Sequence, residues 1–203
     1  MTIPRFYVPG PWTSDRITFP EKASHHAMRV LRMRNGDEAE VFDGEGRTAR
    51  GRTEFSSEGT VLIAESYPEH GRESPLFITL AQAFVSPDKM EWITEKAVEA
   101  GASRIVFFPA ARSVTKLSGD KLTKRLEKLR ATAVSACEQC GRSRIPEIET
   151  FASAEAMLSG LNADARVILA PSSDPGLALG AARSVVFAVG PEGGFSEEEL
   201  TLA

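Results

Sequence analysis

The sequence predicts an α/β protein made of two parts: a small β-barrel, then a mostly parallel sheet with helices on both faces. Three observations support this. Hairpin-like strand patterns occupy residues 1–66, a polar stretch with a proline near each end follows at 67–75, and strands then alternate with helices from residue 76 onward. Strands separated by helices pair in parallel, because each helix carries the chain back to the same edge of the sheet.

The first part is expected to hold one short helix among its strands. Four apolar residues recur at helical spacing there: Ala23, Ala27, Val30 and Leu31. A turn at 35–37 ends this segment, strand patterns cover 39–51 around a turn at 43–46, and a further strand covers 60–66. Short strands in this sequence favour a small barrel.

The stretch 67–75 has the composition of a linker, and we place the domain boundary there, giving domains 1–70 and 71–203. Beyond it we expect strands at 76–84, 104–109, 167–170 and 184–189. Helices are expected from Ser86-Pro87 to Gly101, over 122–137 and over 153–161. Ser196 and Glu199 have the spacing of a capping box, which predicts one more helix start.

Composition excludes several classes of protein. The longest apolar run, Val185–Val189, is far too short to span a membrane. The N-terminal residues lack the apolar segment of a secretory signal, so we expect a cytoplasmic protein. The net charge of −4 argues against coating nucleic acid through bulk positive charge. Charge is nevertheless patterned, since residues 112–130 hold seven basic and two acidic residues, which leaves room for a local basic site.

The two cysteines, Cys137 and Cys140, form a single C-x-x-C pair near the end of the long predicted helix. A zinc cage needs a second pair or spaced histidines, and redox pairs gain reactivity at a helix N-terminus. We therefore interpret both as structural, with Cys137 on the apolar face, and expect no metal.

The strongest local signal is the glycine-rich turn after the strand at 184–189. Ligands of open α/β sheets bind just beyond the carboxyl ends of strands, where glycines allow close backbone approach. A plain tight turn needing positive φ at Gly193 or Gly194 is the commoner explanation of such a pattern. Neither a phosphate loop nor a dinucleotide fingerprint is present, which disfavours a nucleotide-binding oxidoreductase.

Six motifs run in order through nearly the whole chain: Pro4–Val8, His25–Arg32 with Gly36-Asp37, Phe42–Gly44, Lys89–Gly101, Glu138–Arg142 and Gly190–Phe195. Together they resemble the 16S ribosomal RNA uracil-N3-methyltransferase family. The resemblance implies an N-terminal PUA-like RNA-binding barrel, an α/β knot domain of the SPOUT class that binds S-adenosylmethionine, and a homodimer.

The resemblance also places the cofactor at two neighbouring strand ends. The residues implied are Leu169, Ala170, Pro171, Gly190, Pro191, Glu192, Gly193 and Gly194. For catalysis we predict Glu138 as base or orienting carboxylate and Arg142 as the stabiliser of the developing uracil anion. The alternative is that these two residues, four apart, form an exposed helical ion pair.

For RNA we predict contacts from Arg5, Arg29, Arg32 and Arg34 on the barrel, and from Arg112. An ordinary solvated set paired with Glu38, Glu40 and Asp43 is an equal alternative. The implied reaction is methylation of N3 of a specific uridine of 16S ribosomal RNA, within the small ribosomal subunit. The alternatives are an RNA-binding or ribosome-assembly protein without activity, and a SPOUT methyltransferase acting on another RNA base.

The family pattern continues with a segment of the form L-G-x-R-I-L-R-x-E-T-A, which ties the knot and closes the cofactor pocket. The sequence ends at Ala203, before that segment. The 203 residues are therefore expected to form an incomplete knot domain with weak or absent cofactor binding.

Overall fold

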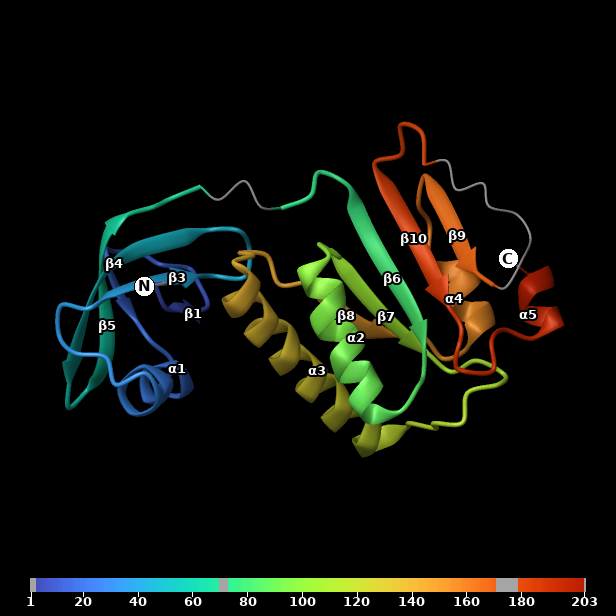
Figure 1. Cartoon of the computed structure of the whole chain (residues 1–203), viewed down its shortest axis with the longest axis horizontal. Coiled ribbons are helices and arrows are strands. Elements are labelled where there is room, and N and C mark those ends of the chain that lie inside the picture. Colours follow the sequence, from blue (N-terminus) through green and yellow to red (C-terminus); the bar gives the residue numbers. More distant parts are fainter. Residues whose placement is uncertain (1–2, 70–72, 171–178, 203) are drawn as a thin grey trace. The chain divides into compact units, whose positions relative to one another are not determined.

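The computed structural model describes residues 3–69, 73–170 and 179–202. The chain divides into two compact units (Figure 1). The first comprises Met1–Glu73 with Cys137–Ile145, and the second comprises Ser74–Ala136 with Pro146–Ala203. We expected a division at residue 70, which lies outside the described residues. The first unit extends to Glu73 and also includes Cys137–Ile145, which the sequence analysis had placed in the second domain.

The first unit contains one five-stranded sheet. Its strands are β1 (Arg5–Tyr7), β2 (Arg16–Thr18), β3 (Glu38–Phe42), β4 (Thr48–Ser56) and β5 (Gly59–Ser66). The order is β1-β3-β4-β5-β2. β1 pairs with β3 in parallel, and the other pairs are antiparallel. The predicted strands at 39–51 and 60–66 are thus confirmed as β3, β4 and β5, while the three-residue strands β1 and β2 were too short to show a period.

The predicted helix of this unit begins as α1 (Glu21–His25) and continues as a π-helical turn, η1 (His26–Val30). Ala27 packs in the core with Phe6 and Leu62. The turn is widened, since the Leu31 N–H bonds to the His26 carbonyl at 3.0 Å. Val30 is 62% exposed, whereas Ala27, which recurs with it at helical spacing, is buried.

The second unit contains a wholly parallel five-stranded sheet in the order β8-β7-β6-β10-β9. Its strands are β6 (Phe77–Ala83), β7 (Arg104–Phe108), β8 (Glu147–Thr150), β9 (Ala165–Leu169) and β10 (Ser184–Val189). The parallel α/β architecture predicted from the sequence is therefore confirmed. Only β8, an edge strand of four residues with a single apolar member, was not expected.

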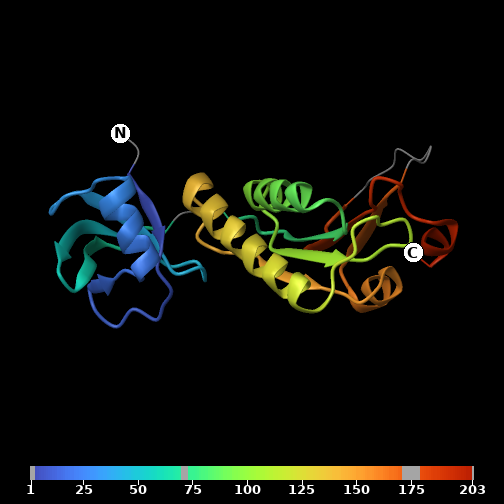
Figure 2. The same cartoon turned by 90° about the horizontal axis from the view of Figure 1, so that it is seen from below.

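The helices are α2 (Pro87–Glu99), α3 (Gly119–Cys140), α4 (Ala154–Gly160) and α5 (Glu197–Thr201). Helices α2 and α4 lie on opposite faces of the sheet (Figure 2). Ser153 caps α4 by accepting from the Ala156 N–H at 3.0 Å, and the predicted capping box starts α5. Ser86 stands at the N-cap of α2 but makes no side-chain capping bond.

One core cluster joins α4 to its face of the sheet through Ala81, Val106, Ala188 and Met157, with Phe195 packed at its end. Because all strands run in the same direction, β6, β7, β9 and β10 end at one edge. Burial of this core fixes those ends, and the loops that follow them carry the candidate site.

Candidate functional site

A hollow of about 530 Å³ lies beyond the carboxyl ends of β9 and β10. A volume of this size is typical of sites for small organic ligands. Seven of the eight residues predicted for the cofactor line it: Leu169, Ala170, Gly190, Pro191, Glu192, Gly193 and Gly194. The eighth, Pro171, lies outside the described residues. The lining also includes Arg112, Val189, Phe195, Glu197 and Leu200, which the sequence had not placed there.

The turn after β10 is tightly folded on itself. The Gly194 N–H donates to the Pro191 carbonyl at 2.8 Å, and Gly194 has φ of +70°, a conformation that favours glycine. A Cβ added at Gly190 would stand 3.0 Å from the Gly194 carbonyl carbon and 3.1 Å from the Phe195 nitrogen. Gly190 is therefore needed for close packing of backbone on backbone, and the resulting turn presents main-chain groups to the hollow.

Gln82, at the end of β6, supports this turn from below. Its side-chain amide donates to the Gly190 carbonyl at 3.1 Å and to the Ala83 carbonyl at 3.0 Å, and the residue is buried. A buried amide with its hydrogen bonds made rigidifies the groups it joins. Sequence reasoning missed this residue, although a glutamine at the end of a buried strand is a signal that could have been used.

Glu199 ties the same turn to the loop after β7. Its Oε2 accepts from the Ser196 N–H at 2.9 Å, which completes the capping box of α5, while its Oε1 accepts from the Ala111 N–H at 2.8 Å. The residue is only 8% exposed. The spacing predicted the capping box, but the bond to Ala111 depends on the sheet bringing β7 and β10 to the same edge.

A hydrogen bond from an arginine and an ion pair border the hollow. Arg112 is exposed, and its Nη1 donates to the Gly193 carbonyl at 3.0 Å. Lys89 lies 2.8 Å from Glu192, and its hydrogen bond lowers the pKa of the Glu192 carboxyl. Arg112 had been assigned to RNA contact from its basic neighbourhood, and the structure places it in the lining of the hollow.

Glu138 and Arg142, the predicted catalytic pair, belong to the segment that joins the first unit. Glu138 Oε1 accepts from the backbone N–H of Tyr7 at 3.0 Å. Arg142 lies beyond the end of α3 and is 6% exposed. The alternative of an exposed helical ion pair is therefore wrong, because one member lies outside the helix and is buried.

Arg142 is held by Glu73. Its Nε and Nη2 lie 3.0 and 2.8 Å from Glu73 Oε2, and Oε1 accepts from the N–H groups of Ser143 and Arg144 at 3.0 Å each. Burial on its own raises the pKa of the Glu73 carboxyl, but the hydrogen bonds from Arg142 and the two N–H groups outweigh it and hold the pKa below 4.5. This cluster is a satisfied internal network.

Arg5 belongs to the same network. Its Nε lies 2.6 Å from Glu40 Oε1, its Nη1 donates to the carbonyls of Cys137 and Arg142, and its side chain is 11% exposed. Nη2 has no hydrogen-bond partner among the described residues. The structure thus separates Arg5 from the other arginines predicted for RNA, since an enclosed guanidinium presents little surface to an external ligand.

Arg29, Arg32 and Arg34 are all exposed, on and just after η1. Within the described part of the chain, none of their guanidinium groups has a hydrogen bond or an ion pair. The acidic residues proposed as their partners are engaged elsewhere. Glu38 pairs with Arg50 at 2.9 Å, Glu40 with Arg5, and Asp43 accepts from backbone N–H groups.

Cys137 is fully buried, and burial raises the pKa of its thiol to about 12. No disulfide joins Cys137 and Cys140. In the ranges 3–69, 73–170 and 179–202, no cluster of three or more His, Cys, Asp or Glu side chains could hold a metal. The described helices include none that is long and apolar enough to cross a membrane.

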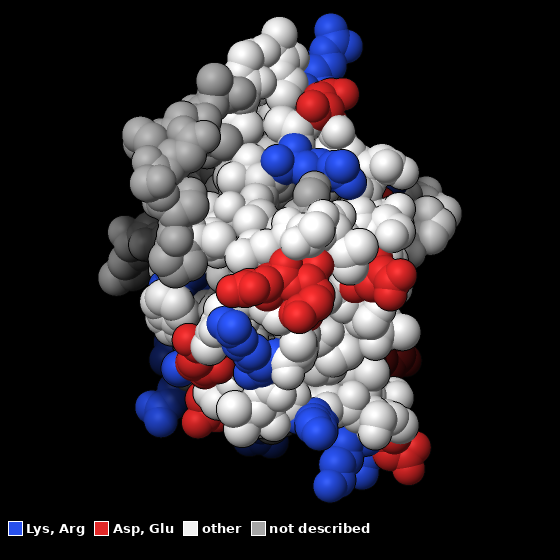
Figure 3. Space-filling model, turned by 90° about the vertical axis from the view of Figure 1, so that its right-hand side faces the viewer, with Lys and Arg blue, Asp and Glu red and all other residues white. Residues whose placement is uncertain are grey.

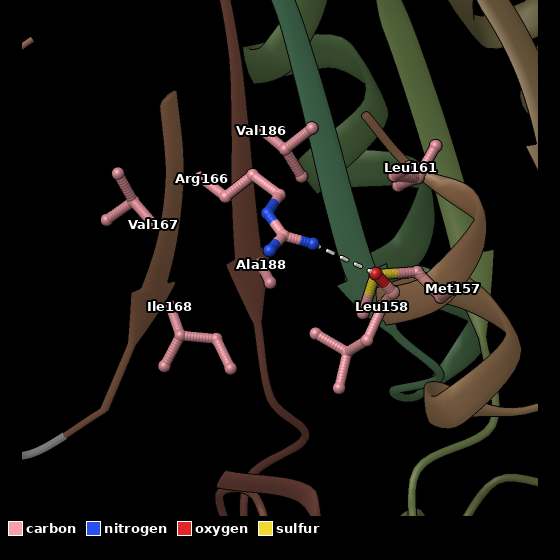
Figure 4. Close-up of a pocket in the computed structure, with 8 residues that line it drawn as sticks. All are labelled: Met157, Leu158, Leu161, Arg166, Val167, Ile168, Val186 and Ala188. Carbon is pink, nitrogen blue, oxygen red and sulfur yellow. Dashed lines mark hydrogen bonds between the residues drawn. The ribbon is translucent and has the colours of Figure 1, made fainter. Parts of the chain in front are cut away.

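Another hollow lies between α4 and the strands β9 and β10 (Figure 4). Its lining is apolar except for Arg166, which reaches over it and donates to the Leu158 carbonyl at 3.2 Å. None of the residues singled out in the sequence lines it. The face of the second unit that carries β9 and α5 is largely uncharged, with scattered groups of both signs (Figure 3).

Two families match this chain. The RNA methyltransferase domain family matches residues 72–203, and the RNA methyltransferase PUA domain family matches residues 19–64. An α/β domain following a PUA-like N-terminal domain is the arrangement these matches support.

Curated relatives include ribosomal RNA small subunit methyltransferase E of Bacillus subtilis, 31% identical over 87% of this chain and 73% of the relative. The protein of the same name from Mycobacterium bovis is 33% identical over 86% of this chain and 70% of the relative.

Two solved structures are similar along the full length of the chain, and each is matched over 85% of its own chain. A Legionella pneumophila protein solved in complex with the cofactor SAM superimposes with a TM-score of 0.92 at 29% identity. Ribosomal RNA small subunit methyltransferase E from Neisseria gonorrhoeae, solved bound to S-adenosyl methionine, gives a TM-score of 0.85 at 30% identity.

Proposed function

This chain belongs to the RNA methyltransferase family that includes ribosomal RNA small subunit methyltransferase E, and we propose that it methylates N3 of a specific uridine in 16S ribosomal RNA. It is an S-adenosylmethionine-dependent enzyme, and ribosomal RNA is its partner. The observation that carries the proposal is the hollow at the ends of β9 and β10, which gathers the predicted cofactor residues that the structure describes.

The residues of the hollow fit this cofactor. Glycine at position 190 lets the turn close on itself, where a Cβ would meet the backbone of Gly194 and Phe195, and the turn lines the hollow. Leu169 and Ala170 would border one side of the ligand, and the turn from Gly190 to Gly194 the other. The cofactor supplies a methyl group on a positively charged sulfur, so that the bond from carbon to N3 forms as the bond from carbon to sulfur breaks and its electron pair stays with sulfur.

The chain's own residues would mainly orient the reactants. Gln82 and Glu199 hold the turn through buried hydrogen bonds, and the apolar stack of Phe108 and Phe195, whose ring centroids lie 6.3 Å apart, supports it from the core. For Glu138 and Arg142 the catalytic roles remain predictions. Loss of methyl transfer in the Glu138→Ala variant without loss of folding would support them.

The remaining assignments rest on the resemblance. We assign residues 1–70 to the PUA-like RNA-binding domain and 71–203 to the SPOUT α/β domain, whose trefoil knot and knot-closing segment remain predictions. A homodimer, an assembled small subunit as substrate and action in the cytoplasm complete the proposal. Arg29, Arg32 and Arg34 are its RNA-facing cations, supported by their exposure and by the absence of competing partners among the described residues.

The test is methylation in vitro. Purified protein and labelled S-adenosylmethionine are incubated with 16S ribosomal RNA and with small subunits from cells lacking the endogenous enzyme, and digested nucleosides are analysed by mass spectrometry. We expect 3-methyluridine at a single position. Methylation of another base would support a related methyltransferase instead, and RNA binding without methyl transfer would support an assembly protein.

A further inference from the structure

Arg112 is the only cationic residue among the described residues that line the hollow. We infer that its guanidinium stabilises the negative charge that develops on the target base during methyl transfer. This inference rests on the proposed function, and it gives Arg112 the role for which sequence reasoning had selected Arg142.

The reaction requires such a group. N3 of uracil carries a hydrogen, and its proton must pass to a base or to solvent hydroxide before or as the nitrogen attacks the methyl carbon. The electron pair left behind is shared among N3 and the two flanking carbonyl oxygens. A fixed cation beside these atoms favours the anion, and removing one such donor typically costs 100- to 1000-fold in rate. A planar guanidinium with several N–H donors suits an anion spread over neighbouring atoms.

Hydrogen bonds fix both the side chain of Arg112 and the backbone beside it. At the side chain, Nη1 donates to the Gly193 carbonyl at 3.0 Å. At the backbone, the preceding N–H, that of Ala111, donates to buried Glu199. The loop is closed by Ser113, whose hydroxyl accepts from the Ala110 N–H at 3.2 Å and whose N–H donates to the Ala110 carbonyl at 3.0 Å. The guanidinium is thereby anchored at one nitrogen while the residue as a whole stays exposed.

Other charged groups near the hollow do not take this role. Glu192 is paired with Lys89, so that the lysine's charge is directed at a carboxylate. Glu197, which lines the hollow, and Glu198 are carboxylates, and hydrogen bonds from its own backbone N–H and from Ser196, with a smaller effect of Arg112, lower the pKa of Glu198. The face of the second unit in Figure 3 shows scattered charged groups of both signs.

Arg142, by contrast, has its guanidinium committed. Two of its nitrogens bind Glu73, and its side chain is 7% exposed. Receiving a base would require breaking a buried ion pair, which is costly because Glu73 would be left with an uncompensated charge. Arg112 needs no such rearrangement, because the carbonyl it binds is itself part of the hollow.

The experiment compares Arg112→Gln and Arg112→Lys with Lys116→Gln, a matched control that neutralises the next exposed basic residue, which does not line the hollow. For each protein, S-adenosylmethionine affinity is measured by calorimetry, folding by thermal unfolding, and single-turnover methylation of 16S ribosomal RNA from pH 6.5 to 9.5. We expect Arg112→Gln to lower the rate about 100-fold at neutral pH, with the cofactor Kd changed less than threefold.

The pH profile identifies the mechanism. If Arg112 favours the uracil anion, the methylation rate of Arg112→Gln should rise with pH at higher pH values than the wild-type rate does. The difference in rate between the two proteins should then shrink at high pH, because solvent hydroxide takes over deprotonation of N3. Arg112→Lys, which keeps the charge, should recover part of the rate and of the profile, and Lys116→Gln should match wild type.

An unchanged profile combined with weakened cofactor binding would overturn the inference and reduce Arg112 to a support of the Gly193 turn. A full rate in Arg112→Gln would overturn it as well. Failure of the wild-type protein to methylate any uridine would instead refute the proposed function, so the two failures are distinguishable. Arg112→Lys keeps the test valid if the glutamine variant does not fold.

Discussion

Arginines that the sequence analysis selected for functional roles differ in their surroundings: two in the first unit are enclosed, and one in the second unit is exposed. In the first unit, Arg5 and Arg142 are enclosed and bound to Glu40, Glu73 and main-chain carbonyls. In the second unit, Arg112 remains exposed beside a hollow, with one hydrogen bond to its rim. A charged residue in a motif can bind a partner inside the protein or a ligand outside it. The contacts that the residue makes in the folded protein show which of the two roles it has.

The largest expected effect lies in the hollow. Gly190→Val places atoms against the backbone of Gly194 and Phe195, where a Cβ alone would already approach to 3.0 Å. We expect the turn to be displaced and the cofactor Kd to rise at least about 100-fold, equivalent to roughly 2.7 kcal/mol, measured by calorimetry. At Gly193 the nearest atom to an added Cβ is the Arg112 side chain at 3.3 Å, which can move. Equal losses for Gly190→Ala and Gly193→Ala would contradict this account.

The buried network of the first unit should respond in stability rather than in cofactor affinity. Glu73→Ala leaves the enclosed Arg142 guanidinium without its carboxylate. We expect a loss of about 3 kcal/mol in unfolding free energy, measured by urea denaturation, with an unchanged cofactor Kd. Glu69→Ala, an exposed carboxylate in the preceding segment, is the control. A destabilisation no larger than that of the control would show that the network contributes little.

Glu199→Gln tests the link between the two loops of the hollow. The amide keeps one acceptor oxygen but turns its NH2 toward the N–H of either Ala111 or Ser196. Losing one buried hydrogen bond of this kind costs about 1–2 kcal/mol, so the cofactor Kd should rise roughly tenfold. The exposed neighbour substitution Glu198→Gln is the control, and identical affinities in the two variants would exclude a positioning role for Glu199.

Acid should weaken the first unit through Glu73. The pKa of its carboxyl is lower in the folded protein than 4.5, so the unfolded state binds the proton more tightly. The stability that the ionised Glu73 carboxylate contributes is fully present above pH 4.5, and it is lost as the pH falls through the pKa of Glu73 in the folded protein. Stability measured by urea denaturation should therefore decline more steeply with acid in wild type than in Glu73→Gln. Parallel declines would assign the acid sensitivity to other groups.

The smallest effect is expected for the exposed arginines of the first unit. In Arg29→Glu with Arg32→Glu, RNA binding should weaken, and the slope of log K against log salt should become shallower by about 1.5 if each side chain contacts one phosphate. Filter binding at several salt concentrations measures this slope. A slope equal to that of wild type would remove both residues from the RNA-binding surface.

Much of the fold was predictable because its signals are local. The apolar runs of β6, β7 and β10, the proline at the start of α2 and the capping box of α5 each depend on a few neighbouring residues. Elements without a period were missed, namely β1, β2 and the edge strand β8. The π-helical turn η1 was not expected either, because a pattern of 3.6 residues per turn does not reveal it.

The order of elements, the glycine-rich turn after β10 and the resemblance to the family follow from the sequence, because local propensity, hydrophobic period and motif identity act over short stretches of chain. Only the folded protein decided that Arg142 meets Glu73, that Glu199 reaches Ala111 and that Arg112 lines the hollow. Arg142 and Glu73 are separated by 69 residues along the chain, Glu199 and Ala111 by 88, and Arg112 and its partner Gly193 by 81. Contacts over such separations arise from the order in which strands join a sheet, and no local pattern encodes that order.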